Sequence, residues 1–120
     1  MALSQPITSS DNFFTGEDKT ITFDVTQADG TTPQVMTGWA LTWELKASVT
    51  GAVQISKTTT AGTIALSNKF GTNDRATVTI ADGDTETVGG GAYYHHLRRT
   101  DAGNEQILAY GDVTLKASGL

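Results

Sequence analysis

The sequence has no cysteine among its 120 residues. That absence excludes a disulfide scaffold, a zinc site built from thiolates and a cysteine nucleophile. Proline occurs twice, and no apolar stretch comes near the roughly 20 residues that a membrane-spanning helix needs. Charged residues make up 18% of the chain, below the roughly 25% of an average soluble domain. The sequence therefore predicts neither a disulfide-stapled protein nor a helical membrane protein.

The charges that are present are mainly acidic. Asp and Glu number 13 against 8 Lys and Arg, so the formal net charge is −5 at pH 7. A chain this acidic is a poor candidate for binding a phosphate backbone, and we expect no nucleic-acid partner. We expect no membrane partner either. The opening MALSQPITSS has neither the basic nor the apolar region of a secretory signal, so we expect synthesis in the cytoplasm.

Threonine and glycine fill the space that charge leaves. The chain has 21 Thr and 13 Gly. Threonine is β-branched and favours strands, while glycine suits the turns between them. The composition therefore predicts an all-β protein.

Alternation of apolar and polar residues predicts the strands. It is clearest where Trp39, Leu41, Trp43 and Leu45 share one side, and we expect this strand, with both tryptophans, at the centre of the core. Further alternating stretches lie at 19–26, 53–55, 64–66, 76–80, 93–99 and 107–115. About seven to nine strands at spacings of roughly 8 to 12 residues are typical of an antiparallel β-sandwich.

Three smaller features complete the predicted layout. Residues 1–12 lack periodicity and are expected to form an extended arm, ahead of a single sandwich domain at 13–120. The acidic stretch 81–88 is short enough for one helical turn. Gly111 is expected to mark a bulge in the last strand.

No motif for catalysis, a cofactor or a metal stands out. His95 and His96 are adjacent on a predicted strand, so they point to opposite faces and are poorly placed to share one metal ion. Asp82, Asp84 and Glu86 have the spacing that opens a calcium loop, but Thr87 stands where the loop needs glycine. We therefore predict a protein that is not an enzyme, with no catalytic, cofactor-binding or metal-binding residues.

The order of segments resembles a group of small bacteriophage virion proteins with an immunoglobulin-like β-sandwich, and also the N-terminal domain of phage upper-baseplate proteins. Three stretches carry the resemblance: FTGEDKTITFDV at 14–25, TGWALTWEL at 37–45, and the region 91–115 with YYHHL, TDAGN and GDVTL. The resemblance implies an immunoglobulin-like fold and a structural role in a virion, and it brings no catalytic residues.

Three functions follow as hypotheses. Because the baseplate proteins continue into further domains and this sequence ends at Leu120, the first is a capsid decoration (cement) protein. It would bind the major capsid protein or other virion proteins in several copies per particle, with a homo-oligomer as one arrangement. The second is a tail or baseplate adaptor. The third is a carbohydrate-binding module, if Trp39, Trp43, Tyr93, Tyr94 and Tyr110 are exposed for stacking on sugars.

The residues expected to contact a partner come from the arm, from the polar loop at 67–74 and from the basic pair that follows the histidines. They are Leu3, Gln5, Ile7, Lys69, Phe70, Asn73, Arg98 and Arg99.

Overall fold

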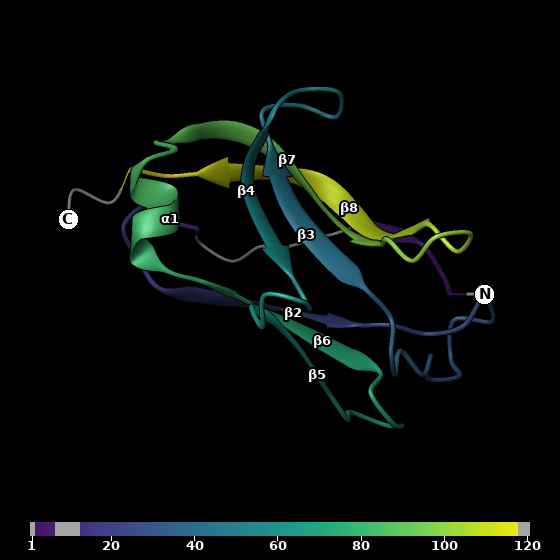
Figure 1. The fold of residues 1–120 in the computed structure, drawn as a ribbon. Helices are drawn as coiled ribbons and strands as arrows, with labels where there is room; N and C mark the ends of the chain where they lie inside the picture. The colour runs from purple at the N-terminus through teal and green to yellow at the C-terminus, as the bar shows by residue number, and fades with distance from the viewer. Residues whose placement is uncertain (1, 7–12, 118–120) are drawn as a thin grey trace.

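Two β-sheets pack face to face in the computed structural model, which describes residues 2–6 and 13–117 (Figure 1). The smaller sheet has the order β2 (Lys19–Asp24), β6 (Arg75–Ile80), β5 (Ile64–Ser67). The larger sheet has the order β1 (Gln5–Pro6), β8 (Gln106–Leu115), β7 (Gly91–Arg99), β3 (Leu41–Lys46), β4 (Val53–Thr58). All neighbouring strands are antiparallel except β1 and β8. The predicted all-β sandwich is confirmed.

The strand order is that of an immunoglobulin-like domain. In such a domain the strands B, E and D form one sheet and C, F and G the other, and a C′ strand extends the second sheet. Here β2, β6 and β5 take the first set of places, while β3, β7, β8 and β4 take the second. The chain changes sheet between β1 and β2, β2 and β3, β4 and β5, and β6 and β7, whereas β3–β4, β5–β6 and β7–β8 are antiparallel neighbours within one sheet.

The core lies between the inner faces of the two sheets. Trp43 on β3 has no exposed surface, as predicted, and Leu45 and Leu97 are buried beside it. Val78 and Ile80 of β6 face them from the other sheet. Burial of one such side chain stabilises the fold by roughly 1.5–3 kcal/mol. Trp39 behaves differently from Trp43, because it precedes β3 and is half-buried at the margin of the core.

A tyrosine corner closes the turn into β7. The Tyr93 hydroxyl donates to the backbone carbonyls of Val88 at 3.2 Å and Gly89 at 3.0 Å. Immunoglobulin-like domains use a tyrosine at this place, two residues before the second cysteine of the inter-sheet disulfide. In this cysteine-free chain that position is His95, which lies in the core against Trp43.

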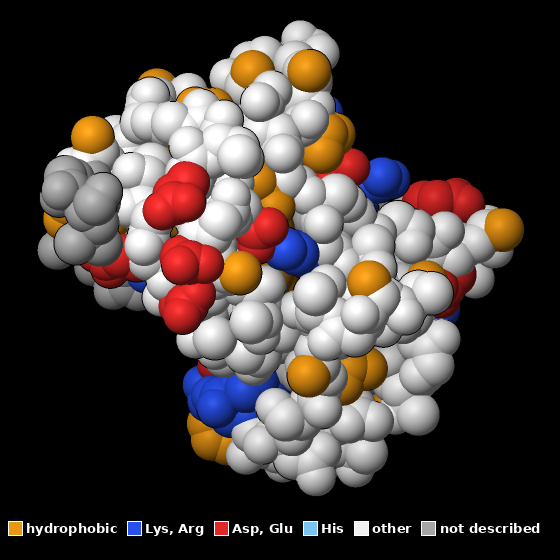
Figure 2. Space-filling view, turned by 60° about the vertical axis from the view of Figure 1, so that its left-hand side comes forward, with side chains coloured by type: hydrophobic (Ala, Val, Ile, Leu, Met, Phe, Trp, Pro, Cys, Tyr) orange, Lys and Arg blue, Asp and Glu red, His pale blue; other side chains and the backbone are white. Residues whose placement is uncertain are grey.

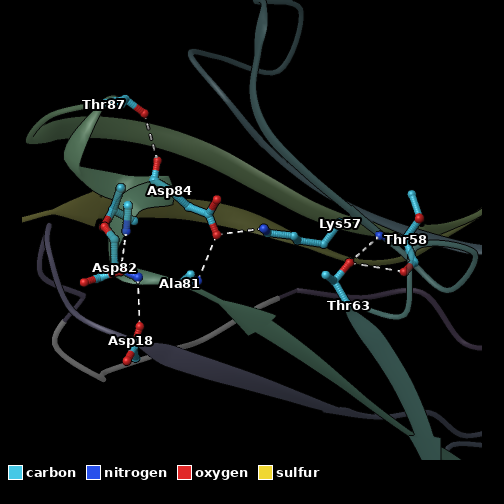
Figure 3. Close-up of polar contacts among 10 residues, drawn as sticks. Asp18, Lys57, Thr58, Thr63, Ala81, Asp82, Asp84 and Thr87 are labelled. Atoms are coloured by element: carbon cyan, nitrogen blue, oxygen red, sulfur yellow. Dashed lines mark hydrogen bonds and ion pairs between the residues drawn. The ribbon is translucent and has the colours of Figure 1, made fainter.

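The predicted helical turn is confirmed as α1 (Asp82–Glu86) between β6 and β7. The Asp84 carboxylate accepts the backbone N–H of Ala81 at 2.8 Å and pairs with Lys57 on β4 at 2.7 Å (Figure 3). Asp18 accepts the N–H of Asp82 at 2.9 Å (Figure 3). These contacts tie the helix to an edge strand of the larger sheet and to the loop before β2. Among the described residues no helix is long and apolar enough to cross a membrane.

The described part of the expected arm lies against the sandwich. Ala2 is buried, and the Leu3 N–H donates to the carbonyl of Thr26 at 2.9 Å. Gln5 and Pro6 then pair in parallel with Ala109 and Tyr110 of β8. The first residues therefore contact the loop that follows β2 and continue along the edge of the larger sheet.

The predicted bulge at Gly111 is wrong. Gly111 pairs in register with His95, and the irregularity in the β7–β8 pairing falls between Leu97 and Arg98. The extra residue there is Leu108, which is buried. The bulge allows the Leu108 side chain to pack in the core and shifts the β7–β8 register by one residue, whereas Gly111 has no side chain to bury.

Candidate functional site

Three loops and the first residues of the chain meet at one end of the sandwich, which we call the loop end. It comprises the β2–β3 loop at 25–40, the β5–β6 loop at 68–74, the β7–β8 loop at 100–105, and residues 2–4. In Figure 1 this end lies to the right, whereas α1 and the C-terminus lie to the left. Loops held by a rigid sandwich are the usual place for binding residues.

The β5–β6 loop is organised around one carboxylate. The Asp74 side chain accepts the backbone N–H groups of Lys69 at 2.7 Å, Phe70 at 3.1 Å and Gly71 at 3.3 Å. These hydrogen bonds, that of Lys69 first, lower the pKa of Asp74 against the opposing effect of its burial. Because three consecutive amides converge on one group, the loop has a defined shape with Phe70 at its tip.

A second set of contacts fixes this loop to the β2–β3 loop. Asn73 donates from its side chain to the Thr37 hydroxyl at 2.9 Å and accepts the N–H of Met36 at its carbonyl at 3.0 Å. Its backbone has a positive φ of 48°, which asparagine tolerates better than most residues. A Cβ at Gly71 would lie 2.9 Å from the Cβ of Pro33, so the two loops are in close contact.

The loop end exposes hydrophobic surface. Phe70 is 80% exposed and Val35, on the neighbouring loop, is 47% exposed. The Lys69 ammonium lies 4.8 Å from the centroid of the Phe70 ring and 2.9 Å from an Asp24 oxygen. Arg75 pairs with the same carboxylate at 2.7 Å, and this hydrogen bond is the main reason that the pKa of Asp24 is lowered.

A half-open cavity of about 440 Å³ lies beside these loops. The Arg99 guanidinium stacks 3.9 Å above the Trp39 ring and donates from Nε to Asp101 at 2.7 Å. Asp101 also accepts the Ala40 N–H at 2.6 Å, and this bond contributes most to lowering the pKa of its carboxyl. The cavity is lined by Ala2, Gln34, Trp39, Arg99, Gly103, Asn104, Glu105 and Gln106.

A separate polar cluster lies on the outer face of the larger sheet. His96 Nε2 lies 2.7 Å from Glu44 Oε1, and Arg98 Nε donates to the same oxygen at 3.2 Å. Burial alone would raise the pKa of Glu44, but these two partners lower it. Tyr94 packs edge-on against His96, with 5.7 Å between ring centroids, and its burial raises the pKa of its phenol. His96 is consequently covered although it points away from the core.

Four of the eight predicted contact residues lie in the loop end: Leu3, Lys69, Phe70 and Asn73. A fifth, Arg99, is the last residue of β7 and contacts the loop end through Trp39 and Asp101. Arg98 and Gln5 lie elsewhere, on the outer face of the larger sheet and in β1. Ile7 lies outside the described residues. These positions leave their role as contacts a prediction. Val35 and the cavity could not be predicted, because neither produces a pattern along the chain. Asp74 had a local signal, as an acidic residue closing a Gly- and Asn-containing loop.

The face of the molecule shown in Figure 2 is largely neutral. On the face shown in Figure 2, uncharged polar side chains and backbone cover most of the area, and acidic side chains gather at the end that carries α1. Among the described residues, no group of three or more His, Asp or Glu side chains is placed to hold a metal ion.

No protein-family model matches the chain, and no curated protein shows significant similarity to it.

Proposed function

We propose that this protein is a structural component of a bacteriophage virion that decorates the head by binding the assembled lattice through its loop end. Its partner is then the major capsid protein or another virion protein, bound in several copies per particle. The resemblance of the sequence to small virion proteins, and the immunoglobulin-like strand order, support this function. The observation that carries it is the loop end, where three interlocked loops present exposed Phe70 and Val35.

The β5–β6 loop is preorganised for binding. An interface that orders flexible loops loses part of its binding energy to conformational entropy. Here the Asp74 carboxylate and the Asn73 contacts order the β5–β6 loop before any partner arrives. A surface with few charged side chains also loses less free energy to desolvation when copies pack densely on a lattice.

Electron microscopy of the tagged, purified protein mixed with particles assembled without it tests the proposal. Label spread over the head is the expected result. Label confined to the tail would favour the tail or baseplate adaptor, which uses the same fold in a different place. The absence of label from the particle, while a control virion protein with the same tag does bind, would contradict the proposal.

The cavity beside Trp39 favours a carbohydrate as the second candidate ligand. Side-chain amides of Gln34, Asn104 and Gln106 line it, and amides hydrogen-bond readily to sugar hydroxyls. Stacking is restricted, because Arg99 covers one side of the Trp39 ring and Trp43 is buried. A glycan array probed with the wild-type protein and with Asn104→Ala tests this ligand; binding that the substitution abolishes would favour it over the virion partner.

A further inference from the structure

Phe70 has a position that the fold itself does not require. It is 80% exposed, so its ring adds little to the core, yet the backbone of its loop is fixed by three hydrogen bonds to Asp74. Aromatic side chains, Phe included, are enriched at protein interfaces relative to the rest of the surface. A large apolar group held in water is otherwise a liability for solubility.

We propose that Phe70 is the anchor residue of this protein, and that it inserts into an apolar pocket on the virion protein to which the loop end binds. This inference rests on the proposed function and adds the chemistry of the partner site. The pocket accepts a phenyl ring, and its rim carries no net charge.

The charges around the ring balance. Lys69 and Arg75 pair with the Asp24 carboxylate, and the buried Asp74 carboxylate also acts electrostatically on Arg75. Two positive and two negative charges therefore lie beside Phe70. An uncharged partner surface matches this balance, because a charged group at the rim of the pocket would lose water without gaining an unpaired charge as its partner.

A protein pocket fits these observations better than a bilayer. The net charge of −5 opposes approach to an anionic membrane. Among the described residues, Phe70 and Val35 are the large apolar side chains that the loop end exposes, whereas membrane insertion gains from a larger set of apolar side chains that enter together. In the loop itself, Phe70 is flanked by Lys69 and Gly71.

Binding of purified variants to particles that lack the protein tests the proposal. Phe70→Ala is expected to weaken binding at least about tenfold, the scale of an interface hot spot. Val49→Ala is the matched control, because Val49 is also exposed, at 60%, but lies in the β3–β4 loop away from the loop end. It is expected to change binding less than about twofold. Thermal unfolding of both variants should match the wild type, since neither side chain is buried.

A third variant tests the shape of the loop. Asp74→Asn keeps Phe70 but weakens the convergence of three amides on one carboxylate, and it is expected to lower affinity several-fold in a protein that circular dichroism shows to be folded. Wild-type binding that Phe70→Ala leaves unchanged would overturn the anchor while leaving the proposed function intact. Absence of wild-type binding would overturn both. Binding to phosphatidylglycerol vesicles that Phe70→Ala abolishes would replace the protein pocket with a membrane.

Discussion

His95 is a neutral imidazole in the middle of the core. Its Nδ1 accepts the Trp43 indole N–H at 3.3 Å, so its proton is on Nε2, which has no hydrogen-bond partner among the described residues. Burial, and secondarily the charge of His96, lower the pKa of His95 to about 4, against a weaker opposite effect of Asp112. Protonation would remove the acceptor for Trp43 and place a charge in an apolar interior.

The stability of the fold is therefore expected to depend on pH through His95. The unfolded chain binds this proton near its ordinary pKa of 6.5 and the folded chain only near 4. The stabilising contribution is complete above pH 6.5 and is lost as the pH falls toward 4. Between pH 7.5 and 4.5 we expect the free energy of unfolding to drop by about 2–3 kcal/mol, measured by urea denaturation.

Two variants separate this effect from that of other groups. His95→Gln is expected to be less stable than the wild type at neutral pH. Its free energy of unfolding is expected to fall much less between pH 7.5 and 4.5, because the position no longer titrates. His96→Gln is expected to show the same fall as the wild type. The carboxyls of Asp24, Asp74 and Asp101 have lowered pKa values, so they lose their contribution at lower pH, below their unfolded value of 3.8. A His95→Gln profile as steep as the wild type would contradict this account.

Tyr93 gives a second prediction at the scale of a residue. Tyr93→Phe removes the donor to the carbonyls of Val88 and Gly89 without opening a cavity. We expect a loss of about 1–2 kcal/mol in the free energy of unfolding, since a partly buried hydrogen bond is deleted and two acceptors lose their donor. Tyr110→Phe is the control, because Tyr110 is exposed, and it should be nearly neutral.

At the scale of elements, α1 is fastened by Asp84. This side chain accepts the Ala81 N–H at the start of the helix and pairs with Lys57 across the open side of the sandwich (Figure 3). Burial opposes ionisation, but Lys57 and the Ala81 amide outweigh it and lower the pKa of Asp84. Because the pair is partly exposed, we expect Asp84→Ala to cost about 1 kcal/mol of stability in urea. Glu86→Ala, on the same helix, is the control, and its loss of stability should be less than half of that of Asp84→Ala.

The first segment gives a prediction about β1. A chain that lacks residues 1–6 loses the buried Ala2, the Leu3 bond to Thr26 and the pairing with β8. We expect it to fold but to be less stable by about 2 kcal/mol, from a few hydrogen bonds of roughly 1 kcal/mol each and the exposed core surface. Unchanged thermal stability would show that residues 1–6 act as an arm outside the fold.

The elements themselves were largely predictable. The alternation around Trp43 placed β3 in the core, because a strand that is buried on one side must repeat every second residue. The helical turn at 81–88 and the polar loop at 67–74 followed from local composition. Gly111 misled because glycine is compatible with a bulge but does not require one, and the bulge at Leu108 depends on how two strands pair.

At the scale of the whole molecule, the order of strands in each sheet did not follow from the sequence pattern. Alternation shows which side of a strand is buried but not which strand lies beside it. The loop end depends on that order, since it places three loops from separate parts of the chain together. Phe70 and Asn73 could be suggested as contacts from their polar loop, whereas the contacts of Asn73 with Met36 and Thr37 required the fold.

The proposed function requires that the molecule binds its partner through the loop end. Hydrogen exchange of the backbone amides, compared between the free protein and the protein bound to particles, tests it most directly. We predict slower exchange at 25–40, 68–74 and 100–105, and no change in α1 or in the β3–β4 loop. Protection confined to α1 and the β3–β4 loop, with the three loops unchanged, would contradict the account.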